Sequence, residues 1–133
     1  MTKRKIKQVL VVRKDLNMRK GKIAAQAAHA SMKVLLDIGK VEEKENETTL
    51  IIPLNNDTKD WFLGAFTKVC VGVNSEQELV DIYEHAKFAG LNCSIIEDSG
   101  LTEFNNVPTL TAVAVGPNWS CDIDEVTGHL PLL

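Results

Sequence analysis

The sequence predicts a single α/β domain with a mixed β-sheet. Short valine-rich apolar runs alternate along the chain with longer amphipathic stretches, which is typical of strands joined by helices. The 133 residues fit the usual size of one domain and are enough to bury a core. Repeats and low-complexity tracts do not occur in the sequence. We therefore expect residues 1–133 to form one domain.

Four strands are predicted from apolar runs that end at turn residues. The first, IKQVLVV at 6–12, ends in an unbroken apolar run, as expected for a strand buried on both faces. The others are VCVGV at 69–73, NCSIIE at 92–97 and TLTAVAVG at 109–116. Because helical stretches separate several of these runs, we expect the strands to form one mixed sheet.

Two long helices and a short one are predicted between the strands. Residues 22–37 carry a polar stripe of Lys22, Gln26, His29 and Lys33, and an opposite face that is mostly alanine. Ser75 and Glu78 form a capping box that opens a helix through about Ala89. CDIDEV at 121–126 predicts one or two helical turns.

Residues 38–60 are less regular. They contain an acidic run (VEEKENE), a candidate short strand (TTLIIPL) and a turn-rich link (NNDTKD). We expect a mobile insertion that could cover or extend a functional site. The following WFLGAFTK, at 61–68, fits either a helix or an approach to the next strand.

The N-terminus is basic and then apolar, but VLVV is too short for the core of a signal peptide or for a membrane span. We therefore expect a cytoplasmic protein without a membrane partner. The three cysteines are odd in number, widely spaced and lack a CxxC pair, which argues against disulfides and a zinc site. Cys70 and Cys93 lie in apolar runs and are expected in the core.

Charge is distributed unevenly along the chain. The first 22 residues hold nine cations and one acid (+8), and the other 111 hold six cations and 17 acids (−11). Arg19, Lys20 and Lys22 lie where a helix should begin, and positive charge is unfavourable there because that end of the macrodipole is already positive. This placement indicates a site for a polyanion. A nucleotide-binding loop of the GxxxxGK[ST] type is excluded by Leu16 and Ile23.

The stretch VLVVRKDLNMRKGKIAAQAAHAS resembles the VxVVRxDLxMGKGKxAAQxxHA motif of the archaeal and eukaryotic (type II) peptidyl-tRNA hydrolases. The resemblance continues in HAKFAGLNCSIIEDSGLT, TAVAVGP and VTGHLPLL, in the family's order and near its spacing. It covers residues 6–37 and 68–133, about three quarters of the chain.

The resemblance implies hydrolysis of the ester between a peptide, or an N-blocked aminoacyl group, and the 3′ end of tRNA. Such an enzyme recycles tRNA from aborted translation, and needs neither a metal nor a cofactor. The resemblance also implies a compact three-layer domain, with helices on both faces of a four-stranded mixed sheet. The expected partners are tRNA and a second copy of the chain, since family members often pair as dimers.

By motif, the resemblance implies five catalytic residues: Lys22, Gln26, Asp98, Thr102 and Thr111. Asp98 could orient or deprotonate water, and Lys22 could keep Asp98 ionised and stabilise developing negative charge. This requires the two to meet at one sheet edge, which we expect if their strands are neighbours. Four further cations are expected on the tRNA backbone: Arg13, Lys14, Arg19 and Lys20.

The sequence departs from the family pattern near this predicted site. Arg19 replaces a glycine, Leu101 an arginine and Pro131 a lysine, while Thr111 lies one residue beyond the usual spacing. The loop that usually reads QIAPGS begins here as EFNNVP, at 103–108, with an added acid. We expect these changes to weaken tRNA affinity more than chemistry.

Alternatives remain open at this point. The chain could be a catalytically inactive relative that binds RNA or protein, or a hydrolase for another acyl ester or amide on an anionic carrier. Lys22 and Asp98 could be only a structural ion pair. Gln26 could be an ordinary polar-face residue, and Thr111 an ordinary strand residue.

Overall fold

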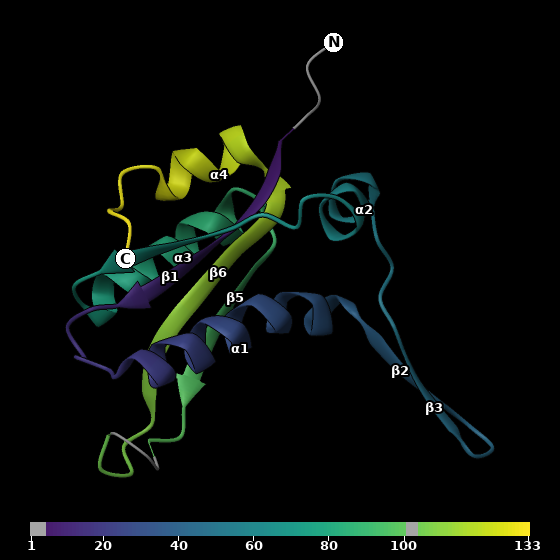
Figure 1. Ribbon diagram of the computed structural model, residues 1–133, viewed down its shortest axis with the longest axis horizontal. Coiled ribbons are helices and arrows are strands. Elements are labelled where there is room, and N and C mark those ends of the chain that lie inside the picture. Colours follow the sequence, from purple (N-terminus) through teal and green to yellow (C-terminus); the bar gives the residue numbers. More distant parts are fainter. Residues whose placement is uncertain (1–4, 101–103) are drawn as a thin grey trace.

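A four-stranded mixed sheet of order β4-β1-β6-β5 forms the centre of the protein (Figure 1). The computed structural model describes residues 5–100 and 104–133. The strands are β1 (Ile6–Arg13), β4 (Lys68–Val73), β5 (Cys93–Asp98) and β6 (Thr109–Trp119). β4 runs parallel to β1, whereas β6 is antiparallel to both β1 and β5. The predicted mixed sheet is therefore confirmed.

Helices cover both faces of the sheet (Figure 1). Along β1, Val9 and Val11 pack in the core beneath α3 (Glu76–Phe88) and α4 (Ser120–Thr127). The alternate residues Leu10 and Val12 pack in a second core beneath α1 (Lys20–Ile38), on the face that also carries α2 (Asn56–Leu63). Because side chains alternate along a strand, one apolar run supplies both cores. The expected three-layer arrangement is confirmed.

Small residues allow α1 to lie close to the sheet. Ala27 and Ala30 pack against Ala112 and Ala114 of β6. The Ser94 hydroxyl of β5 donates a hydrogen bond of 2.7 Å to the carbonyl of Ala30. With 19 residues, α1 is about 28 Å long and runs across the strands from one end of the sheet to the other.

The segment after α1 forms a two-stranded hairpin that extends away from the body (Figure 1). It consists of β2 (Lys40–Lys44) and β3 (Glu47–Ile51), which pair only with each other among the described strands. The hairpin begins at the C-terminal end of α1, so it lies far from Lys22 at the other end of that helix. The expectation that residues 38–60 could cover or extend a functional site stays a prediction, although the hairpin itself lies away from Lys22. The mobility of residues 38–60 as an insertion stays a prediction. The assignment of residues 1–133 to one domain also stays a prediction.

Trp61 settles the structure of the ambiguous stretch 61–68. It lies in the last turn of α2, is 2% exposed and donates a hydrogen bond from Nε1 to the carbonyl of Thr67, 2.9 Å away. The stretch therefore contains the end of α2, a turn and the start of β4. No helix in the described ranges is long and apolar enough to cross a membrane.

The prediction that Cys70 lies in the core is wrong. Cys70 is exposed and Cys93 is only partly buried. Cys70 lies on β4, at the edge of the sheet, where the neighbouring helices leave its side chain uncovered. An apolar run does not by itself reveal whether a strand is central or at an edge.

Candidate active site

An ion pair between Lys22 and Asp98 forms the centre of the candidate site. Lys22 Nζ lies 3.0 Å from Asp98 Oδ1, and the two side chains are only 13% and 14% exposed. Their elements are α1 and β5, and β5 is separated from β1 by β6. From the sequence, Lys22 and Asp98 are expected to meet if the first strand and the strand ending at Asp98 are neighbours. These strands, β1 and β5, are not neighbours. Lys22 instead reaches Asp98 because α1 packs across both β6 and β5.

Gln26 connects this pair to the sheet. It is 1% exposed, and its Nε2 donates to Asp98 Oδ1 over 3.3 Å. Its Oε1 accepts a hydrogen bond from the hydroxyl of Thr111, which fixes the orientation of the amide. Gln26 follows Lys22 by one turn and faces the same sheet edge. The predicted polar stripe is therefore buried at Gln26, where it faces the strand ends.

A β-bulge directs Thr111 towards Gln26. Ile96 of β5 pairs with Ala112, and the next residue, Glu97, pairs with Leu110. Thr111 is thus the extra residue of β6, and it lies on the α1 side together with Ala112 although the two are adjacent. The bulge gives a structural reason for the shifted spacing of this threonine in the sequence.

Hydrogen bonds hold Asp98 in its charged form. The hydrogen bond from Lys22 lowers the pKa of Asp98 below its ordinary value of 3.8, although burial acts in the opposite direction. Further lowering comes from the backbone N–H of Gly100, which donates to Asp98 Oδ2 over 2.9 Å, from the charge of Lys22 and from Gln26. Among the described residues Gly100 is the donor to Oδ2, which leaves this oxygen able to accept from water. Asp98 is therefore a carboxylate at neutral pH.

Gly100 and Phe104 belong to the site but were not predicted. Gly100 has φ of +84°, and a Cβ there would lie 2.2 Å from the carbonyl oxygen of Val107, so a side chain cannot be accommodated. The aspartate-serine-glycine turn in the sequence was the available signal for it. The ring of Phe104 has its centroid 5.7 Å from Lys22 Nζ. Thr102, the remaining predicted catalytic residue, lies outside the described residues.

The four predicted tRNA contacts differ in their surroundings. Arg13 donates to both carboxylate oxygens of Asp15, at 3.1 and 2.7 Å, and to the carbonyl of Leu110. These bonds join the β1–α1 loop to β6, and the hydrogen bond from Arg13 lowers the pKa of Asp15. The aliphatic part of the Lys14 side chain lies beside Gly72 of β4. β4 and β5 are the two outer strands of the sheet, so Lys14 lies at the edge opposite to Asp98.

Arg19 and Lys20 are exposed at the N-terminus of α1, whose first turn contains no acidic residue. Their positive charges therefore lie at the positive end of the helix dipole, next to the turn that carries Lys22. The structure thus keeps the unfavourable charge placement that the sequence indicated, close to the ion pair.

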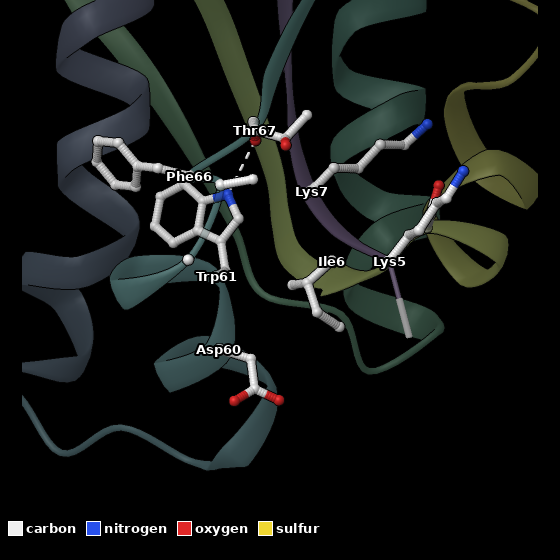
Figure 2. A pocket seen from close by; sticks show the side chains of 10 residues that line it. Lys5, Ile6, Lys7, Asp60, Trp61, Phe66 and Thr67 are labelled. Carbon is white, nitrogen blue, oxygen red and sulfur yellow. Dashed lines mark hydrogen bonds between the residues drawn. The ribbon is translucent and has the colours of Figure 1, made fainter. Parts of the chain in front are cut away.

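A cavity of about 580 Å³ lies elsewhere, between α2 and the start of β1 (Figure 2). Trp61, Phe66 and Ile6 line it, with Lys5 and Asp60 at its border. β1 has eight residues, so roughly 25 Å of strand separates this cavity from the strand end near Lys22. It is not part of the candidate site. Within the described ranges, no group of three or more His, Cys, Asp and Glu residues could hold a metal ion.

Comparisons with known proteins agree on one family. The family described as "Peptidyl-tRNA hydrolase PTH2" matches residues 6–133. A peptidyl-tRNA hydrolase of Methanocaldococcus jannaschii is 44% identical over 128 residues, which cover 96% of this chain and all of the relative. Proteins of the same name from Methanothermobacter thermautotrophicus and Thermococcus onnurineus are each 40% identical, over 96% of this chain and 100% and 97% of their own lengths.

We expect Lys22→Met to raise the pKa of Asp98, because the largest lowering cause is removed while burial remains. Titration of the Asp98 carboxyl carbon by NMR measures this pKa. The low pKa also stabilises the fold above the unfolded-state value, and this contribution is lost as pH falls through the folded-state pKa. The free energy of unfolding should therefore fall less in Lys22→Met than in the wild type as pH decreases from the unfolded-state pKa of Asp98 to its folded-state pKa. The control is Lys33→Met, which removes an exposed pair with Asp37 on the same helix; an equal response to both variants would contradict the assignment.

Proposed function

This chain belongs to the peptidyl-tRNA hydrolase PTH2 family, and we propose that the cluster around the Lys22–Asp98 ion pair is where it hydrolyses the ester of peptidyl-tRNA. The observation that carries the proposal is this partly buried pair, in which Asp98 also accepts hydrogen bonds from Gln26 and from the N–H of Gly100, while Thr111 holds Gln26 in place. Nothing in the comparisons favours a catalytically inactive relative.

In the proposed reaction, Asp98 orients the attacking water. A general base works best when its pKa is near the working pH, and the pKa of Asp98 is lowered instead. Its Oδ2 therefore serves chiefly to accept a hydrogen bond from water and to direct the water lone pair at the ester carbonyl. The bond from water oxygen to carbonyl carbon forms, and the bond from that carbon to the ribose oxygen breaks. One proton of the attacking water ends on the leaving ribose oxygen, which becomes a hydroxyl group, and the peptide leaves as a carboxylic acid that ionises in solution.

Lys22 supplies positive charge where negative charge develops on the carbonyl oxygen. The ammonium group is only partly exposed, and electrostatic stabilisation is stronger where water is partly excluded. Gln26 and Thr111 keep Asp98 oriented, so that little reorganisation is needed as the reaction proceeds. Because the ammonium provides the charge that a metal ion supplies in other hydrolases, we propose that the reaction needs no metal.

The exposed cations at the start of α1 are proposed to hold the tRNA backbone. Arg19 and Lys20 adjoin the turn that contains Lys22, so phosphates next to the esterified 3′ end can reach them. Lys14 and Arg13 are proposed to extend this surface, with Arg13 also bracing the loop through Asp15. Since the substrate arises from translation, the proposed location is the cytoplasm.

A second copy of the chain is proposed to cover the groove between α1 and α2. This groove of about 380 Å³ is almost wholly apolar and is bordered by Met32, Phe62 and Phe66, each of which is exposed. Exposed aromatic and methionine side chains gathered in one place mark interaction surfaces. The groove lies beside residues 28–35 of α1, whereas Lys22 lies in the first turn of that helix. A second copy bound in the groove therefore leaves the site open.

The function is tested by the release of a labelled N-blocked aminoacyl group from tRNA in the presence of EDTA. We expect turnover by the wild type, and a loss of about 100-fold or more in Lys22→Ala and in Asp98→Asn, because each removes one half of the central pair. Lys33→Ala, on the exposed side of the same helix, should behave like the wild type. Normal rates in Asp98→Asn would refute the assigned site. Binding of tRNA without wild-type turnover would support the binding-module alternative, and turnover abolished by EDTA would refute metal independence.

Arg19→Ala and Lys20→Ala should mainly raise KM and leave kcat nearly unchanged. Each loses a backbone contact, so the slope of log(kcat/KM) against log[salt] should become shallower by about one unit. Lys59→Ala, an exposed lysine of α2, is the matched control. Loss of kcat with an unchanged salt slope would place these cations in the chemistry instead.

Phe62→Glu should shift the protein from dimer to monomer in sedimentation velocity, because it places a charge in the apolar groove. Phe88→Glu makes the same change on an exposed phenylalanine of α3 and should leave the dimer intact. A wild type that sediments as a monomer at all accessible concentrations would rule the dimer out.

A further inference from the structure

We propose that Phe104 is a positioning residue that holds the Lys22 ammonium beside Asp98 through a cation–π contact. This inference rests on the proposed function, because it concerns the same site. Phe104 lies in the loop between β5 and β6, and its ring is partly buried against the apolar cluster beneath α1.

Among the described residues, Lys22 Nζ has contacts of two different kinds. The carboxylate of Asp98 lies 3.0 Å away, and the centroid of the Phe104 ring lies 5.7 Å away. Lysine has a long flexible stem, so an ammonium that makes a second contact populates fewer conformations. An aromatic face attracts a cation up to about 6 Å from its centroid.

The ring attracts Lys22 without adding charge. A second carboxylate in its place would also hold the ammonium, but it would repel the phosphates of tRNA and the developing oxyanion. The aromatic face does neither, since it is neutral and cannot take a proton from the ammonium. The arrangement therefore restrains Lys22 and preserves the net positive charge of this end of the protein.

The backbone links the position of the ring to that of Asp98. Gly100 donates its N–H to Asp98, and its carbonyl accepts from the N–H groups of Phe104 and Asn106, at 3.4 and 2.9 Å. The carbonyl of Phe104 in turn accepts from Val107, 2.9 Å away. The ring is partly buried against the apolar cluster beneath α1. Among the described residues, Asp98 and Phe104, which both contact Lys22, are thus both hydrogen-bonded to Gly100.

The test compares Phe104→Leu, which keeps apolar volume but lacks a ring face, with Phe104→Tyr, which keeps the ring. In the tRNA ester assay we expect Phe104→Leu to lower kcat about 3- to 10-fold with little change in KM, and Phe104→Tyr to remain near wild type. Phe88→Leu makes the same change on α3, at a side chain that is 95% exposed, and should have no effect. Equal losses in the leucine and tyrosine variants, or normal kcat in Phe104→Leu, would overturn the proposal.

A second readout does not depend on turnover. Lys22 lowers the pKa of Asp98 through its hydrogen bond and its positive charge, so this pKa reports whether the ammonium stays beside the carboxylate. NMR titration of the folded variants should therefore show a higher Asp98 pKa in Phe104→Leu than in the wild type and in Phe104→Tyr. An unchanged Asp98 pKa in folded Phe104→Leu overturns the role of Phe104 even if the wild type is active. A raised pKa together with an inactive wild type supports the role of Phe104 and refutes the proposed function instead.

Discussion

The partly buried ion pair of Lys22 and Asp98 is the interaction on which the arrangement of the site depends. Removing two charges from water costs free energy, which their attraction offsets only when the remaining hydrogen-bonding groups are satisfied. The protein meets this condition from three elements. Gln26 is supplied by α1, Thr111 by the bulge of β6, and the N–H of Gly100 by the turn after β5. The bulge, the positive φ of Gly100 and the close approach of α1 to the sheet all contribute to one small polar cluster.

Periodicity and the family motifs were sufficient to predict the sheet and most of the site. The apolar runs identified all four strands of the central sheet because a strand covered on both faces requires apolar side chains in both directions. Lys22, Gln26, Asp98 and Thr111 were predicted, and the structure brings them together. Phe104 was not predicted, because its contact with Lys22 depends on how a loop folds back, which no periodic pattern encodes.

Several features depend on the tertiary arrangement, which a linear sequence does not express. The order of strands decided the exposure of Cys70, because β4 lies at an edge. The burial of Gln26 depends on which part of α1 lies over the strand ends, so a helical stripe changes from buried to exposed along its length. The sequence indicated a short strand where β3 lies, but not its partner β2, whose charged, largely exposed residues give no alternating apolar pattern.

The separation between this hairpin and the ion pair has a consequence for how the protein can diverge. About 24 Å of helix lies between them, and the hairpin strands bond only to each other among the described strands. Insertions, deletions and charge changes in residues 40–51 therefore do not alter the hydrogen bonds around Asp98. Selection can act on the length and surface of this arm independently of selection on the chemistry. Natural variation is thus better tolerated at one end of α1, whereas the first two turns of the same helix are constrained by the contacts of Lys22 and Gln26 with Asp98.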